Sequence, residues 1–180
     1  TTNCAWEVPS GGLPWWAGRR DTTSLALFQR RMREAAGRGG PAANVRPAQY
    51  FYGAAGGYLA LARADTANAI RHFAALPDSV YCALVNCQWE KVTAAVLLAA
   101  RREDRAAAAI LDQWVPQING GLAVYGLLIR AGIAERLGDL ATARRAYRHV
   151  ADSWRHADPE LAGYEAEAEA GIARLSSRTR

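Results

Sequence analysis

The sequence predicts an all-α fold of stacked antiparallel helical hairpins, preceded by an irregular N-terminal arm. Three observations predict it: an alanine-rich composition, a hairpin pattern that occurs three times, and well-marked helix ends. Alanine is the best helix former, and few β-branched residues compete with it. Of the 180 residues, 51% are hydrophobic, which is enough for a buried core, and 22% are charged, as in ordinary folded proteins.

Residues 1–20 are predicted to be a loop or an extended arm, because prolines and glycines interrupt them. Trp6, Trp15 and Trp16 lie in this arm. They either pin the arm onto its own helical body or insert into a neighbouring subunit as a partner contact, and the first option needs no partner. Residues 21–180 are predicted to form one helical domain.

The domain is predicted to begin with two helices. Asp21 is an N-cap candidate for a helix that runs to about residue 36, and residues 37–41 break that helix with glycines and a proline. The next helix is expected from about Pro47 to Ala64, where it opens the first hairpin of the repeated pattern.

Three stretches share a small-residue helix, a short polar turn and a second helix: residues 57–76, 95–114 and 131–150. In each second helix a large residue follows a small one by four positions, so both lie on one face, one turn apart. The small residues lie 38 and 36 positions apart. Because one hairpin cannot bury its apolar face alone, we expect hairpins to stack, with the large residue filling the groove to the next hairpin. The pairs are Ala69 with Phe73, Ala107 with Leu111, and Ala143 with Tyr147.

The end of the chain carries the clearest helix boundaries. Gly138 is suited to a left-handed helix end, and Asp139 to the cap of the next helix. Asp158-Pro159-Glu160 predicts the start of a closing helix, with a cap, a first-turn proline and an acid. The predicted buried stripe of that helix is Leu161, Tyr164, Ala168, Ile172 and Leu175.

These residues resemble tetratricopeptide-like repeat regions, and most closely those in the C-terminal parts of some bacterial serine/threonine protein kinases. The resemblance covers about residues 50–175. It implies an α-solenoid that senses or binds partners. In that family such regions follow a kinase domain and a membrane span. The stretches that carry it are residues 58–65, 76–79, 97–101, 134–139, 151–154 and 157–161.

The chain departs from that family because it has no kinase motif. It lacks a glycine-rich phosphate loop, a strand lysine and a His-Arg-Asp stretch, so kinase activity is not carried over. The chain begins at Thr1 and not at a methionine, which we interpret as removal of a signal peptide, of an upstream domain or of sequence used for expression.

The cysteines leave two interpretations open. Cys82 and Cys87 lie five positions apart at a predicted helix entry, where they form either a disulfide or two buried thiols. A disulfide indicates an oxidising compartment and leaves Cys4 free or intermolecular. We therefore expect an extracytoplasmic location, periplasmic or cell-surface, with the cytoplasm as the alternative.

No catalytic, cofactor or metal site is predicted. The three histidines are not spaced with the cysteines as zinc ligands, and the sequence contains no nucleophile elbow. The net charge of +5 comes almost wholly from arginines dispersed over helix faces, without the interleaved aromatic residues that stack on nucleic acid. The longest apolar run, residues 92–100, is too short to span a membrane.

The sequence therefore predicts a non-catalytic interaction or scaffold module with protein partners, and no small-molecule substrate. The alternatives are a structural subunit that self-associates into a ring or filament within a membrane-associated assembly, or the sensor region of a bacterial signalling kinase.

Overall fold

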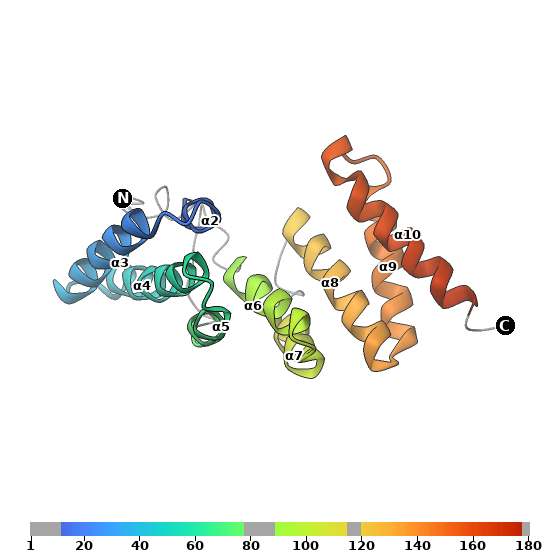
Figure 1. Ribbon diagram of the computed structural model, residues 1–180, viewed down its shortest axis with the longest axis horizontal. Helices are drawn as coiled ribbons and strands as arrows, with labels where there is room; N and C mark the ends of the chain where they lie inside the picture. The colour runs from blue at the N-terminus through green and yellow to red at the C-terminus, as the bar shows by residue number, and fades with distance from the viewer. Residues whose placement is uncertain (1–11, 78–88, 115–119, 178–180) are drawn as a thin grey trace. The chain divides into compact units, whose positions relative to one another are not determined.

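The computed structural model describes residues 12–77, 89–114 and 120–177, and these residues are helical apart from short connections (Figure 1). No strand occurs within these ranges, which confirms the predicted all-α class. No helix in the described part of the chain is long and apolar enough to cross a membrane. The sequence predicts one domain over residues 21–180, whereas the contacts divide the chain into two compact units, Thr1–Ala94 and Ala95–Arg180.

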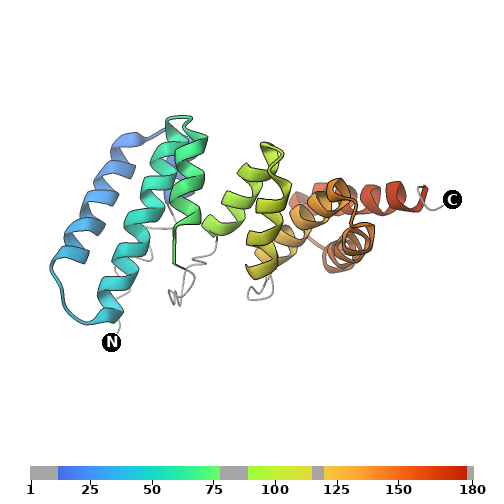
Figure 2. The same ribbon diagram turned by 90° about the horizontal axis from the view of Figure 1, so that it is seen from below.

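The first unit is built on three helices packed in sequence. Helix α3 (Thr22–Gly37) packs on α4 (Ala42–Ala62), and α4 packs on α5 (Thr66–Ala74), so the three lie side by side (Figure 2). The short helix α2 (Leu13–Gly18) lies against α3 and α4. Helix α6 (Trp89–Ala100) begins in this unit and crosses into the next.

The second unit continues from the end of α6 with four further α-helices. Helix α8 (Gly121–Leu137) contacts α7 (Asp104–Trp114) and α9 (Leu140–Trp154), and α9 contacts α10 (Ala162–Ser177). A 3-10 turn, η2 (Pro159–Leu161), leads into α10. The core of this unit is shared by α8, α9 and α10, and its largest members are Leu128, Tyr147, Val150, Trp154 and Leu175.

Four turns between helices have the same backbone geometry. Each contains one residue with positive φ, followed by an acidic residue whose N–H donates to the carbonyl five positions earlier at 2.8–3.0 Å. The carbonyl of that acidic residue then accepts from a fully buried residue four positions later. This closes one helix and starts the next within three residues. The positive-φ residues are Arg20, Ala64, Arg102 and Gly138, and the acidic residues are Asp21, Asp65, Glu103 and Asp139.

The shared geometry predicts opposite effects of two substitutions. Ala64 has φ 60° and Gly138 has φ 80°. A left-handed residue with a side chain is strained by about 1–2 kcal/mol, and glycine loses about 0.4–1 kcal/mol more conformational freedom on folding. Gly138→Ala should therefore lower the free energy of unfolding by about 1 kcal/mol, and Ala64→Gly should raise it by about 0.5 kcal/mol. Urea denaturation would measure the free energy of unfolding of both variants, and two changes of the same sign would contradict the shared turn geometry.

Several element boundaries differ from the sequence-based predictions. Residues 13–18 are helical, so the prediction of an extended arm is wrong there; Pro14 occupies the first turn, where its missing N–H costs no bond. Helix α4 begins at Ala42, five residues before the predicted start at Pro47, which instead lies inside the helix. Asp158 makes no side-chain cap, and α10 begins at Ala162 after the 3-10 turn. In contrast, the predicted caps Asp21 and Asp139 each accept a hydrogen bond from the backbone N–H three residues later.

Candidate functional site

The six predicted repeat-packing residues are all buried in the cores of the two units. Each of them is at most 2% exposed, and the alanines and the large residues share one helix face as their spacing requires. Phe73, however, packs edge to face on Tyr58 of α4 with ring centroids 5.0 Å apart, inside its own hairpin. That it also fills the groove to the next hairpin stays a prediction. The six residues are Ala69, Phe73, Ala107, Leu111, Ala143 and Tyr147.

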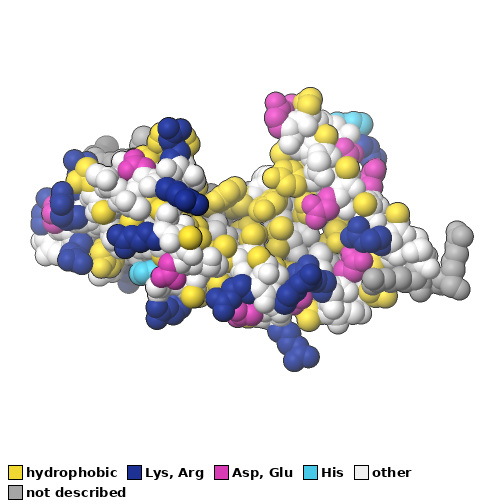
Figure 3. Space-filling view, in the orientation of Figure 1, with side chains coloured by type: hydrophobic (Ala, Val, Ile, Leu, Met, Phe, Trp, Pro, Cys, Tyr) yellow, Lys and Arg dark blue, Asp and Glu magenta, His cyan; other side chains and the backbone are white. Residues whose placement is uncertain are grey.

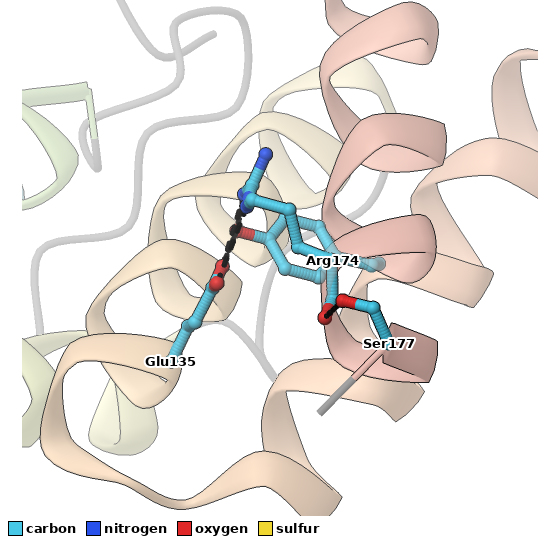
Figure 4. A network of polar contacts seen from close by, with 4 residues as sticks. Glu135, Arg174 and Ser177 are labelled. Atoms are coloured by element: carbon cyan, nitrogen blue, oxygen red, sulfur yellow. Dashed lines mark hydrogen bonds and ion pairs between the residues drawn. The ribbon is translucent and has the colours of Figure 1, made fainter. Parts of the chain in front are cut away.

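Tyr147 also belongs to a polar network that joins α8, α9 and α10 (Figure 4). Its hydroxyl donates to Glu135 Oε2 at 3.1 Å, and the Arg174 guanidinium donates to both oxygens of Glu135, at 2.9 and 3.2 Å. Burial and the neighbouring Glu135 raise the pKa of Tyr147 to about 12. Because each member bonds to another member, the network fixes the three helices against one another.

Two charged residues at the start of α6 are buried in the first unit. Glu90 is 6% exposed and accepts a hydrogen bond from the Tyr50 hydroxyl at 3.0 Å. Lys91 is 9% exposed and donates to the carbonyl of Leu76 at 2.7 Å, just beyond the C-terminal end of α5. Burial raises the pKa of Glu90 to about 7, and it also raises the pKa of Tyr58, whose ring lies close to this carboxyl. This cluster was not predicted from the sequence, although two opposite charges stand directly before the apolar run 92–100.

The second unit carries a hollow of about 350 Å³ over α7, α8 and α9, which we call the α7–α9 hollow. Leu111, Leu127 and Ala146 give it apolar walls. Most of its polar side chains are basic, namely Arg130 of α8 and the exposed Arg145 and His149 of α9. Its one carboxylate is that of Asp112 on α7. The remaining lining residues are Asp112, Arg130, Thr142, Arg145 and His149.

Arg130 is the most constrained of the polar residues in the α7–α9 hollow. Its side chain is 13% exposed, and it donates through Nε and Nη2 to the two carboxylate oxygens of Asp112, at 2.6 and 3.0 Å. Its Nη1 atom is buried without a hydrogen-bond partner. Arg130 is the only charged residue in the sequence between Gly121 and Ala134, which is the signal that could have identified it.

A second groove, of about 330 Å³, lies over α6, α8 and α10. Arg102, Arg136 and Glu167 contribute charged side chains to its lining. Arg136 is held by Asp104, with Nε to Oδ2 at 2.9 Å and Nη2 to Oδ1 at 2.5 Å, and this pairing holds the pKa of Asp104 below its usual range. Hydrophobic side chains gather over α8 on the face drawn in Figure 3.

The other predicted site residues are placed only in part. Cys4, Cys82, Cys87 and Trp6 lie outside the described residues, so the disulfide stays a prediction. Trp16 packs on Phe28 of α3 with ring centroids 6.2 Å apart, whereas Trp15 is 61% exposed beneath the Arg19 guanidinium. Tyr164, predicted to be buried, is 38% exposed; its ring packs edge to face on Tyr125 and at a tilt against Trp154. Within the described ranges, no three His, Cys, Asp or Glu side chains lie together as metal ligands.

Comparison of the chain with models of known families, with curated proteins and with solved structures gives no match. The tetratricopeptide resemblance therefore stays a prediction.

Proposed function

We propose that the chain is a non-catalytic protein-interaction module and that the α7–α9 hollow receives part of a protein partner. The observation that carries the proposal is a hollow whose apolar walls come from α7, α8 and α9 and whose basic side chains come from α8 and α9. Arginine is enriched at protein interfaces, and the buried centre of an interface is more apolar than its polar rim.

The chemistry of the hollow suggests what such a partner presents. Leu111, Leu127 and Ala146 suit an apolar side chain, which the volume of about 350 Å³ can hold. Arg145 and His149 are exposed beside them and suit a carboxylate or a backbone carbonyl of the partner. Asp112 holds Arg130 by two hydrogen bonds, so that guanidinium is already oriented before a partner arrives.

Two matched charge reversals on α9 test this proposal. Arg145 and Arg148 are both exposed, but only Arg145 lines the hollow. Purified wild type, Arg145→Glu and Arg148→Glu would be used as baits in extracts of the source cells, and recovered proteins would be quantified by mass spectrometry. We expect a partner that wild type and Arg148→Glu retain and Arg145→Glu loses, with its affinity for Arg145→Glu at least about tenfold weaker by calorimetry. Partners bound equally by both variants, or no partner at all, would contradict the proposed site.

A further inference from the structure

The positive charge of the chain is concentrated in its first unit. Residues 12–77, which hold α2 to α5, carry nine arginines against three acidic residues, an excess of six positive charges. Residues 95–177 carry ten arginines against eleven acidic residues, an excess of one negative charge. All nine arginines of the first unit are exposed, and Figure 3 shows those on one face in dark blue. They are Arg19, Arg20, Arg30, Arg31, Arg33, Arg38, Arg46, Arg63 and Arg71.

The acidic residues of α2 to α5 neutralise little of this charge. Asp21 and Asp65 accept hydrogen bonds from backbone N–H groups at the starts of α3 and α5, so their carboxylates are already engaged at the helix ends. Within residues 12–77, Arg30 is the one arginine in an ion pair. In the second unit, by contrast, five arginines are paired with carboxylates: Arg101, Arg130, Arg136, Arg155 and Arg174.

Glu34 is the exposed acidic residue of α3, and the arginines around it outweigh its charge. Its ion pair with Arg30 is long, 3.9 Å, and both side chains are more than half exposed, so the pair is weak. Arg31 lies three positions before Glu34 and Arg38 four positions after it, which makes both of them its neighbours on the helix surface. The face around Glu34 therefore keeps a net positive charge.

Helix α3 and its two ends present the densest part of this charge. Six of the nine arginines lie between residues 19 and 38, along a helix of about 24 Å. The hydrophobic residues on one side of α3 are buried, whereas Leu27, on another side, is 37% exposed. Arg30 and Arg31 follow Leu27 by one helical turn and lie beside it. Arg63 of α4 lines the same open hollow as Leu27 and Arg30, so a second helix adds charge to this side.

Two aromatic rings of the first unit carry an arginine on one face. Trp15 is 61% exposed, and the Arg19 guanidinium lies 5.0 Å from its ring centroid, just before the start of α3. The Arg33 guanidinium lies 5.6 Å from the ring centroid of Tyr52. An exposed tryptophan beside arginines suits the boundary between lipid headgroups and acyl chains. Stacking of nucleic acid bases instead uses ring faces that no other side chain covers.

We propose that the first unit docks on the surface of an anionic lipid bilayer through α3, with its arginines on lipid phosphates and Leu27 at the level of the headgroups. Charge complementarity selects a polyanion, and guanidinium groups bind phosphate oxygens well. A bilayer surface also takes up an exposed leucine or tryptophan beside basic residues, whereas a nucleic acid backbone offers Leu27 no apolar contact. The α7–α9 hollow belongs to the second unit, so this docking does not depend on the proposed partner site.

Flotation of the purified chain with lipid vesicles tests the proposal. At low salt, wild type should bind vesicles of equal parts phosphatidylcholine and phosphatidylglycerol, and should not bind vesicles of phosphatidylcholine alone. Arg30→Glu combined with Arg31→Glu should weaken binding at least about tenfold, since each basic residue near an anionic surface strengthens binding about fivefold. Arg105→Glu combined with Arg148→Glu makes the same charge change on exposed residues of the second unit and should bind nearly as wild type does. Far-UV circular dichroism checks that both double variants keep their helices.

A second pair of variants tests the apolar part of the contact. Leu27→Ala should weaken binding to the anionic vesicles about threefold, whereas Leu137→Ala, at another exposed leucine, should not change it. High salt should release the protein, and duplex DNA at equal phosphate concentration should not.

Five outcomes would each overturn the proposal: no binding to the anionic vesicles, equal binding to the neutral ones, equal loss in the two double variants, Leu27→Ala binding as wild type does, or displacement by DNA. Arg145→Glu should bind vesicles normally, so failure of this inference and failure of the proposed partner site give different results.

Discussion

The free energy of unfolding is expected to fall by up to about 3 kcal/mol between pH 4.5 and pH 7, and Glu90→Gln should abolish that fall. Burial raises the pKa of the Glu90 carboxyl from 4.5 to about 7 in the folded protein. In the unfolded chain the same carboxyl is in water and keeps its ordinary pKa. The folded protein therefore favours the protonated carboxyl. The free energy of unfolding falls wherever the unfolded chain has lost this proton and the folded protein still holds it.

The sign follows from the two pKa values. Below pH 4.5 Glu90 is protonated in both states, so none of the free energy of unfolding is lost through its ionisation. Between pH 4.5 and about 7 the unfolded state loses its proton while the folded state keeps it, so unfolding becomes easier. Above pH 7 both states are ionised, and the folded protein holds a buried negative charge whose hydrogen bond from Tyr50 offsets only part of the cost.

Urea denaturation of wild type and Glu90→Gln across pH 4.5 to 8 would measure this effect. Glutamine keeps the shape of the side chain and cannot ionise, so the stability difference between the two proteins should widen by up to about 3 kcal/mol as pH rises. Glu34→Gln, which changes an exposed carboxyl of the same unit, should run parallel to wild type. A difference between wild type and Glu90→Gln that stays constant across the range would show that Glu90 does not titrate as its burial requires.

A second large effect is expected from two glycine-to-alanine substitutions around Tyr147. A Cβ at Gly171 of α10 would lie 2.5 Å from Tyr147 Cε2, whereas a Cβ at Gly132 of α8 would lie 3.7 Å from the Tyr147 hydroxyl oxygen, an ordinary contact. Gly171→Ala should lower the free energy of unfolding by about 1–3 kcal/mol, because the buried Tyr147 ring has no room to shift and α10 must move away from it. Gly132→Ala should raise it by about 0.5–1 kcal/mol, because alanine is the better helix former.

The two glycine variants control for each other, since both change a mid-helix glycine beside the same ring. Urea denaturation should separate their stabilities by about 2–4 kcal/mol, with wild type between them. The network of Tyr147, Glu135 and Arg174 gives a second readout, because a displaced α10 pulls Arg174 away from Glu135. If Gly171→Ala were as stable as Gly132→Ala, the close approach of α10 to Tyr147 would be wrong.

Local chemistry made much of the helical framework predictable. Asp21, Gly138 and Asp139 act through atoms three to five residues away, so their roles as caps and helix end are visible in sequence. The same holds for the buried face of each second helix, where Ala69 and Phe73 follow the helical period. The recurrence of an acidic residue after a left-handed residue is a sequence feature in the same sense, although Arg20, Ala64 and Arg102 stand where glycine is expected.

The sequence by itself determined that the described part of the chain is helical, where the helices next to Asp21, Gly138 and Asp139 begin and end, and which face of each second helix is apolar. Only the tertiary structure decided what each face meets: that Phe73 packs inside its own hairpin, that Tyr164 stays partly exposed, and that Glu90 lies beside Tyr50, 40 positions away in the chain. The physical reason is range. Capping and periodicity depend on atoms within one or two helical turns, whereas burial of a charge or the lining of a hollow depends on side chains that folding brings together from distant helices.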